Sequence, residues 1–278
     1  MDFIEILKIV FLGIVEGVTE WLPVSSTGHM LLFDEFIKLN LSDAFKEMFF
    51  VVIQLGAILA VVCCFFKKML PIQVKDKSQP LWKKDTLMLW LKVVVACIPG
   101  AIVTLLFDDF IEEHLHTPYV IAGTLILYGI AFIVVEKLNK NKTPKTDNLT
   151  DITFKTALLI GFFQVLSIIP GTSRSGATII GALIIGVSRP AAAEFTFFLA
   201  VPVMFGLSFL KILKFGFSFT AVEIWTLLLG MLVAFLVSLL VIKFLMSYIK
   251  KKDFSLFGYY RIGLGVIVIL YFVITALI

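Results

Sequence analysis

Long apolar runs alternate with short polar segments along this chain, and six of the runs are long enough to cross a membrane as helices. About 20 helical residues span a hydrocarbon core of roughly 30 Å. The six runs lie near residues 45–66, 86–107, 118–138, 191–211, 222–246 and 259–278. The pattern predicts an all-α polytopic membrane protein that forms a single membrane domain over residues 1–278.

Two other apolar regions do not fit this pattern, because each is interrupted in its middle. Residues 1–37 are broken at Pro23 and the polar residues after it, and residues 152–187 are broken at Pro170 and Gly171. Broken backbone at membrane depth is tolerated only where it is buried in protein or lines a wet cavity. We therefore expect both regions to be re-entrant helical hairpins.

Lysine-rich segments set the expected orientation of the spans. Residues 67–85 hold six lysines, residues 137–155 hold five and residues 243–252 hold four. The positive-inside rule places all three segments in the cytoplasm, and alternation through the spans is consistent with this assignment. The acidic segment 108–113 is then expected to be an outer loop.

The two broken regions also resemble one another. A shift of 147 residues pairs Ser26 with Ser173, and after one inserted residue it pairs Glu16 with Gln164. Three full spans separate corresponding ends, so the halves would be inverted: a first repeat over residues 1–138, a cytoplasmic linker at 139–151 and a second repeat over 152–278. Inverted repeats with broken helices place a site near the bilayer midplane, where the two hairpin tips would meet.

Composition supports a membrane protein and excludes other classes. The chain is 60% hydrophobic and 16% charged, and its mean hydropathy is +1.03, above that of soluble domains. A formal charge of +4, spread over short loops, does not indicate a nucleic-acid partner. The three cysteines lie in apolar runs without metal-ligand spacing, so neither disulfides nor a cysteine metal site is expected.

The first hairpin carries two carboxylates that would project from one helical face. Glu16 and Glu20 are four residues apart, and Gly13 and Gly17 mark a nearby side where another helix can approach closely. Two carboxylates in a low-dielectric cavity repel each other, so either one is protonated or a divalent cation lies between them. The alternative is a solvated pair at the membrane interface.

Hydroxyl groups follow the first break. Pro23 would end the first half-helix. Ser25, Ser26 and Thr27 are natural N-cap residues for the next helix, whose free N–H groups would bind an anion. His29 would share a face with Ser26, and a hydroxyl with a base in reach is the minimal activated nucleophile. The alternative is that these hydroxyls only cap the helix.

The second hairpin tip supplies a fixed positive charge. Arg174 is flanked by Ser173, Ser175 and Thr178. Its planar donor fork matches phosphate oxygens two at a time. The alternative is a structural ion pair with one of the two glutamates of the first tip. Both interpretations predict that the two tips touch.

Three motifs closely resemble those of the bacterial undecaprenyl-diphosphate phosphatase family, also called bacitracin-resistance proteins. They are Glu-x-x-x-Glu at 16–20, Pro-Val-Ser-Ser-Thr-Gly-His at 23–29 and Pro-Gly-Thr-Ser-Arg-Ser-Gly-Ala-Thr at 170–178. The resemblance covers the whole chain, including its length and number of spans. It implies dephosphorylation of undecaprenyl diphosphate to undecaprenyl phosphate, which recycles the lipid carrier for peptidoglycan synthesis. It also implies resistance to bacitracin, which sequesters that substrate.

The resemblance implies roles for the residues of these motifs. Ser26 would be the nucleophile or a phosphate ligand, with His29 as a proton-transfer group beside it. Arg174 would bind the diphosphate, while Glu16 and Glu20 would handle protons or bind a divalent cation, Mg²⁺ or Ca²⁺. The substrate-binding residues would be Ser25, Thr27, Gly171, Thr172, Ser173, Arg174, Ser175 and Thr178.

The resemblance also implies a location and partners. The chain is expected to be a multi-pass protein of the bacterial cytoplasmic membrane, with its active site open toward the outer face. Its partners would be undecaprenyl diphosphate and membrane lipid, with a homodimer as one possible assembly. A lipid-carrier flippase or secondary transporter is the leading alternative, because inverted repeats that meet at the midplane are typical of transporters. A structural membrane scaffold is the other.

Overall fold

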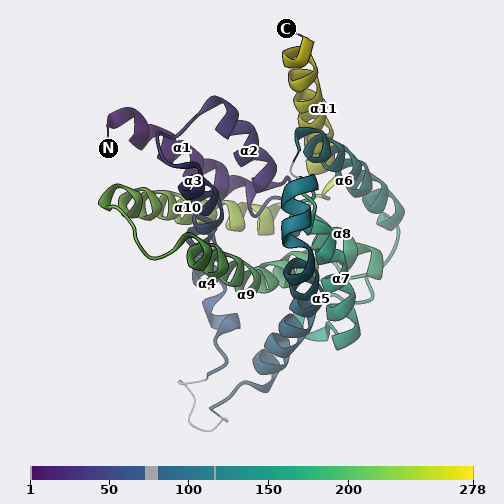
Figure 1. The fold of residues 1–278 in the computed structure, drawn as a ribbon. Helices are drawn as coiled ribbons and strands as arrows, with labels where there is room; N and C mark the ends of the chain where they lie inside the picture. Colours follow the sequence, from purple (N-terminus) through teal and green to yellow (C-terminus); the bar gives the residue numbers. More distant parts are fainter. Residues whose placement is uncertain (1, 73–80, 116, 278) are drawn as a thin grey trace.

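The computed structural model describes residues 2–72, 81–115 and 117–277, and these ranges are helical throughout apart from loops and two isolated β-bridges (Figure 1). The helices are α1 (Phe3–Thr19), α2 (Ser26–Phe36), α3 (Asp43–Val52), α4 (Gln54–Met69), α5 (Lys84–Leu115), α6 (Pro118–Asn139), α7 (Phe154–Val165), α8 (Arg174–Ile185), α9 (Arg189–Phe215), α10 (Ala221–Tyr248) and α11 (Ser255–Leu277), with short 3₁₀ helices at Leu149–Asp151 and Leu166–Ile168.

Six helical stretches in the described residues are long and apolar enough to cross a membrane. They coincide with the six predicted runs: α3 together with α4, most of α5, and α6, α9, α10 and α11. The prediction of an all-α polytopic membrane protein is therefore confirmed at this level. One boundary was wrong, because α5 continues as a helix to Leu115, through the acidic segment 108–113 that was expected to be a loop.

The two interrupted regions form two pairs of short helices, and the break in each pair lies at the proline that predicted it. α1 and α2 pack together, and their outer ends are joined because the Lys8 ammonium donates to the carbonyl of Lys38 (2.7 Å). α7 and α8 also pack together, and the Lys145 N–H, in the segment that leads to α7, donates to the Gly186 carbonyl at the end of α8 (2.7 Å). Each pair therefore points its broken end toward the middle of the molecule.

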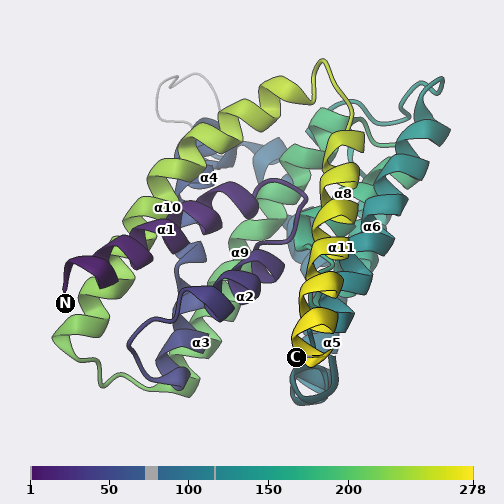
Figure 2. The same ribbon diagram turned by 90° about the horizontal axis from the view of Figure 1, so that it is seen from above.

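Small residues let the helices pack closely around these pairs. α1 lies along α10 (Figure 2), and a Cβ added at Gly17 would stand 2.8 Å from the carbonyl oxygen of Ala234. α4 crosses α10 more tightly, since a Cβ at Gly56 would stand 2.0 Å from the carbonyl oxygen of Met231. Close backbone approach at small residues is the usual basis of helix association in membranes, because lipid is as apolar as the helices. The close approach expected beside Gly17 is confirmed.

The described residues of the lysine-rich segments lie at one end of the bundle, where ion pairs connect the helices. Glu136, at the end of α6, is buried and accepts two close contacts from Arg189 at the start of α9 (2.9 Å from Nε to Oε1 and 2.5 Å from Nη2 to Oε2). The Phe254 N–H, just before α11, donates to the same carboxylate (3.0 Å). Lys68 pairs with Glu194 at this end (2.8 Å). These contacts fix the ends of α4, α6 and α9 relative to one another.

We predict that Gly56→Ala lowers the free energy of unfolding by about 1–3 kcal/mol, because the added methyl group would force α4 and α10 apart. Thermal unfolding of the purified protein in detergent measures this. Gly123→Ala on α6 is the matched control, since a Cβ there would meet nothing within 4 Å. Equal melting temperatures for the two variants would contradict the prediction.

Candidate active site

The second helix of each pair begins in the same unusual way. Ser25, before α2, has φ 75°, and Ser173, before α8, has φ 72°. They are the two non-glycine residues with positive φ among the described residues. Each serine side chain accepts a hydrogen bond from a backbone N–H three residues on (3.2 Å from Gly28 and 3.1 Å from Gly176). Such a backbone costs on the order of 1–3 kcal/mol and clusters at functional sites.

This shared geometry defines which positions of the two tips correspond. Ser25 corresponds to Ser173, so Ser26 and Arg174 are each the first residue of their helix. The pairing of Ser26 with Ser173, expected from the sequence shift, is therefore displaced by one residue. The reason is an extra residue in the second tip, between Pro170 and the capping serine.

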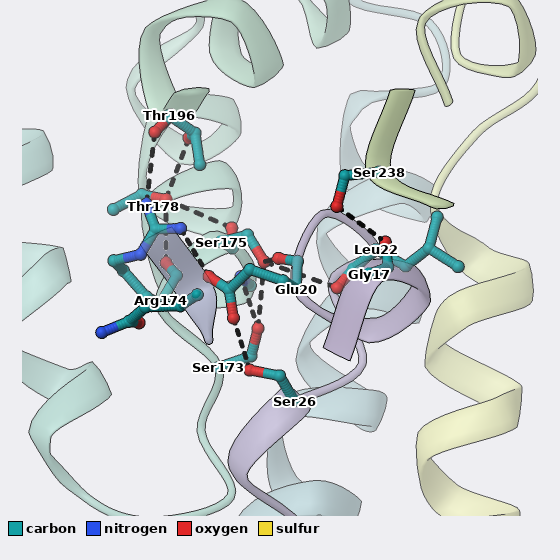
Figure 3. A network of polar contacts seen from close by, with 12 residues as sticks. Gly17, Glu20, Leu22, Ser26, Ser173, Arg174, Ser175, Thr178, Thr196 and Ser238 are labelled. Atoms are coloured by element: carbon teal, nitrogen blue, oxygen red, sulfur yellow. Dashed lines mark hydrogen bonds and ion pairs between the residues drawn. The ribbon is translucent and has the colours of Figure 1, made fainter. Parts of the chain in front are cut away.

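Glu20 joins the two tips (Figure 3). One oxygen of its carboxylate accepts a hydrogen bond from the Ser26 hydroxyl (2.5 Å), and the other accepts one from Nη2 of Arg174 (2.8 Å). The side chains of Arg174 and Glu20 are only 11% and 9% exposed, so water screens their attraction little. The prediction that the tips touch is confirmed. The contact is an ion pair between Arg174 and Glu20, which was the alternative given for the role of Arg174.

Further hydroxyl groups hold the second tip in place. The Ser175 hydroxyl lies 3.4 Å from the carbonyl oxygen of Glu20, across the contact between the tips. The Thr178 hydroxyl bonds the Arg174 carbonyl (2.9 Å) and the hydroxyl of Thr196 on α9 (2.9 Å). Nη1 of Arg174 donates to the Thr196 carbonyl (3.3 Å). These contacts orient the arginine without occupying all of its donors.

A cavity of about 560 Å³ opens beside the joined tips. It brings together many of the predicted site residues: Glu16, Glu20, Ser25, Ser26, Thr27, Gly171, Ser173 and Arg174. Three predicted substrate-binding residues do not line it: Thr172, Ser175 and Thr178, which are buried behind the tip. From this polar end the cavity continues between α3, α5 and α9, whose side chains there are mostly apolar.

His29 is not among the residues that line the cavity. Its Nδ1 is 2.7 Å from the Ser25 carbonyl oxygen, and its Nε2 is 2.7 Å from the hydroxyl of Tyr260 on α11. The imidazole also stacks on the Tyr260 ring, with an interplanar angle of 2°. The expected pairing of His29 with the Ser26 hydroxyl is wrong for this structure, because both ring nitrogens have other partners and Ser26 donates to Glu20 instead.

Glu16 and Glu20 both line the polar end of the cavity, where one of them is protonated or a divalent cation binds between them. Glu16 is 2% exposed, and its carboxylate makes no hydrogen bond or ion pair with any described residue. Carboxylate oxygens are the preferred ligands of Mg²⁺ and Ca²⁺. Within the described ranges, no three His, Cys, Asp or Glu side chains are grouped so that they could hold a metal ion. A cation at Glu16 and Glu20 would therefore need oxygen ligands of another kind.

Arg261 is a component of the site that the sequence analysis missed. It is fully buried on α11 and donates to the carbonyls that precede both serines: Nη1 to Pro23 (3.1 Å), and Nη2 to Gly171 (2.8 Å) and Thr172 (2.9 Å). No acidic partner for it is recorded among the described residues. An arginine within an apolar run was the available indication.

The fold and the site define a class: a polytopic membrane protein in which two broken helix pairs bring carboxylates, serines and an arginine to one internal cavity. The chain matches the family model described as bacitracin resistance protein BacA over residues 9–267, and it belongs to that family.

Similar proteins cover nearly the whole chain. An Undecaprenyl-diphosphatase of Enterococcus faecalis is 70% identical over 97% of this chain and 98% of its own length. Undecaprenyl-diphosphatases of Lachnoclostridium phytofermentans and Desulfitobacterium hafniense are 63% and 59% identical, the first over 99% of this chain and all of its own length, the second over 98% of each.

We predict that Arg261→Lys lowers both the melting temperature and the activity. A lysine ammonium lacks the planar donor fork that binds the carbonyls of both breaks at once. One or more of these buried carbonyls would therefore lose a charged donor, at a cost of about 1–3 kcal/mol each. Thermal unfolding and phosphate release are the two measurements. Lys250→Arg, at an exposed position after α10, is the control for the effect of exchanging lysine and arginine. A variant as stable and active as the wild type would contradict the role given to Arg261.

Proposed function

We propose that the protein hydrolyses undecaprenyl diphosphate to undecaprenyl phosphate and inorganic phosphate. This reaction recycles the lipid carrier for peptidoglycan synthesis and confers resistance to bacitracin. The single observation that carries the proposal is the contact of Glu20 with both Ser26 and Arg174 at a cavity. Full-length relatives that are named for this activity support the choice of substrate.

Arg174 and the two helix N-termini bind the diphosphate in this proposal. The arginine fork can take two phosphate oxygens at once, and the starts of α2 and α8 both line the cavity, so their free backbone N–H groups can bind the same anion. Arg174 leaves Glu20 when it engages the substrate, because one guanidinium edge cannot bind both groups fully. Ser173, at the cavity wall, adds a hydroxyl contact.

Ser26 is the nucleophile, and Glu20 is its general base. The Ser26 oxygen attacks the terminal phosphorus, its proton passes to Glu20, and the bond from that phosphorus to the bridging oxygen breaks, which releases undecaprenyl phosphate. Water then attacks the phosphoserine, phosphate departs and Glu20 returns its proton to Ser26. The net reaction consumes one water. A hydrogen bond of 2.5 Å between the two side chains supports this proton path.

A divalent cation, Mg²⁺ or Ca²⁺, is the proposed cofactor, with Glu16 and Glu20 as its protein ligands. When bound, it would neutralise charge on the phosphate oxygens, which is a principal need of phosphoryl transfer. The unpaired carboxylate of Glu16 supports this assignment.

The apolar part of the cavity accommodates the start of the polyprenyl tail. Along α9 the cavity is lined from Pro202 to Lys211, and nine helical residues rise about 14 Å. A pocket of this volume suits a small ligand rather than a whole polyprenyl chain. The rest of the tail would remain in the lipid.

The two helix pairs are proposed to be re-entrant hairpins of two inverted repeats in the bacterial cytoplasmic membrane. Matched breaks at Ser25 and Ser173 support the repeat. The gathering of lysine-rich segments at one end supports a cytoplasmic location for that end. The cavity extends instead toward Glu47 and Lys211 at the opposite end of α9, which supports access from the outer face. A homodimer stays a prediction.

We predict that Glu20→Gln lowers phosphate release from undecaprenyl diphosphate by about 10²–10⁴-fold, the usual contribution of a positioned general base. Ser26→Ala should lower it at least as far. Purified protein in detergent is assayed, with Ser42→Ala as the control, because Ser42 caps α3 but does not line the cavity.

Two results would contradict this account in different ways. A Ser26→Ala rate within tenfold of the wild type would favour direct attack by water over a phosphoserine. Wild-type protein that binds the lipid but releases no phosphate would favour the transporter alternative.

We predict that Gly206→Leu raises KM for undecaprenyl diphosphate by about tenfold, because the new side chain would fill the apolar part of the cavity. Inhibition by inorganic pyrophosphate, which occupies only the polar end, should be unchanged. Gly263→Leu on α11 is the control, since it is equally unobstructed and does not line the cavity. Equal losses for pyrophosphate and for the lipid would show that Gly206→Leu disturbs the polar end instead.

A further inference from the structure

His29 is buried, and both nitrogens of its ring make short contacts. The residue is 4% exposed. Nδ1 lies 2.7 Å from the carbonyl oxygen of Ser25, and Nε2 lies 2.7 Å from the hydroxyl oxygen of Tyr260. No step of the proposed reaction uses this imidazole, which does not line the cavity. Any effect of His29 on the reaction must therefore pass through one of these two partners.

The two contacts select one tautomer of the imidazole. A neutral imidazole has one N–H donor and one acceptor nitrogen. The Ser25 carbonyl can only accept, so the hydrogen is on Nδ1, and Nε2 is then the acceptor of a hydrogen bond from the Tyr260 hydroxyl. With the hydrogen on Nε2 instead, the lone pair of Nδ1 would face the carbonyl oxygen and repel it. The hydroxyl of Tyr260 thus favours the tautomer that holds the Ser25 carbonyl.

The Ser25 carbonyl helps to set the position of Ser26. A peptide unit is planar, so the orientation of this carbonyl also fixes that of the Ser26 N–H. The backbone needs such a restraint, because the φ of 75° at Ser25 is unfavourable for a residue with a side chain. The carbonyl accepts from both the backbone N–H (3.2 Å) and Nδ1 of His29. The imidazole therefore restrains the backbone that carries the Ser26 hydroxyl.

The second tip has no equivalent of this imidazole. Ala177 takes the place of His29 there, four residues after the serine with positive φ. Its backbone N–H donates to the Ser173 carbonyl (2.9 Å), but its side chain has no donor. Arg174, the first residue of that helix, is held by contacts of its own guanidinium. Ser26 has a short side chain with one partner, so its position depends more strongly on the backbone.

We propose that His29 and Tyr260 form a positioning pair for the nucleophile. The Nδ1–H of His29 holds the Ser25 carbonyl, so that the Ser26 hydroxyl meets its base. The Tyr260 hydroxyl keeps the imidazole in the tautomer that this requires. Tyr260 directly precedes Arg261, so two successive residues of α11 act on the first break. This inference rests on Ser26 as the nucleophile of the proposed function, and His29 transfers no proton in it.

Two replacements of His29 separate its two nitrogens. The amide nitrogen of His29→Asn lies where Nδ1 was and can still donate to the Ser25 carbonyl, whereas the amide of His29→Gln lies nearer the place of Nε2. We expect His29→Gln to lower kcat for undecaprenyl diphosphate by about 10–100-fold, as misplaced reacting groups do, and His29→Asn to stay within about threefold of the wild type. The pH dependence of kcat in His29→Asn should be unchanged, because Glu20 remains the base.

Tyr260→Phe tests the partner of the imidazole. We expect kcat to fall about three- to tenfold, because both tautomers of His29 would then be populated and one of them releases the Ser25 carbonyl. Tyr259→Phe is the matched control, since Tyr259 is the exposed neighbour on α11 and makes no hydrogen bond with a described residue. If thermal unfolding shows that His29→Gln does not fold, Tyr260→Phe, which removes a single oxygen, still decides.

Several outcomes would overturn the proposal. Equal losses in His29→Asn and His29→Gln would do so, and an altered pH dependence would then indicate proton transfer by the imidazole. Wild-type kcat in both variants, or a loss in His29→Asn alone, would also contradict it. So would a Tyr260→Phe enzyme as active as Tyr259→Phe. The proposed function fails separately, if the wild type releases no phosphate or if Ser26→Ala keeps its rate.

Discussion

The guanidinium of Arg261 holds two helix breaks together in the interior of the protein, and the candidate site depends on that contact. Breaking a helix leaves carbonyls and N–H groups that hydrocarbon cannot satisfy. Here the carbonyls of Pro23, Gly171 and Thr172 share one buried donor fork. The breaks are thereby fixed next to each other, and the serines that follow them start α2 and α8 side by side. The partners of Arg261 are carbonyls of both tips, so its one side chain connects the two breaks directly.

Neither tip forms the candidate site alone. The first contributes Glu16, Glu20 and Ser26 but no cation, and the second contributes Arg174 but no carboxylate. In the described structure Glu20 neutralises Arg174, which lowers the cost of burying either charge. In the proposed function, the diphosphate takes over the guanidinium edge that Glu20 holds, and Glu20 then accepts the Ser26 proton. That proposal couples substrate binding to activation of the nucleophile through one carboxylate.

Much of this arrangement could be predicted from the sequence, because the membrane restricts it strongly. Hydropathy identified the six spans, and proline in apolar sequence located both breaks. Phosphate binding by Arg174 and an ion pair of Arg174 with a glutamate were both open from the sequence, and both predicted that the tips touch. Glycine spacing on α1 also predicted the close packing that α10 provides at Gly17.

The remaining features depend on contacts between distant segments, which local patterns do not encode. His29 was expected beside Ser26, but the packing of α11 presents Tyr260 to it. Arg261 lies near the start of the last run, and no local pattern indicates its contacts with Pro23, Gly171 and Thr172. The one-residue displacement between the tips arises from the extra residue between Pro170 and Ser173. It becomes evident only from the positive φ of Ser25 and Ser173, which the sequence does not indicate. α5 extends to Leu115 because nothing in the acidic segment stops a helix.

The most direct test of a composite site is a structure with a bound prenyl methylenediphosphonate, an analogue that cannot be hydrolysed. The account predicts that its terminal phosphonate contacts both Ser26 and Arg174, one from each tip, and that Arg174 no longer pairs with Glu20. A phosphonate held by one tip alone, with the ion pair between Arg174 and Glu20 intact, would contradict it.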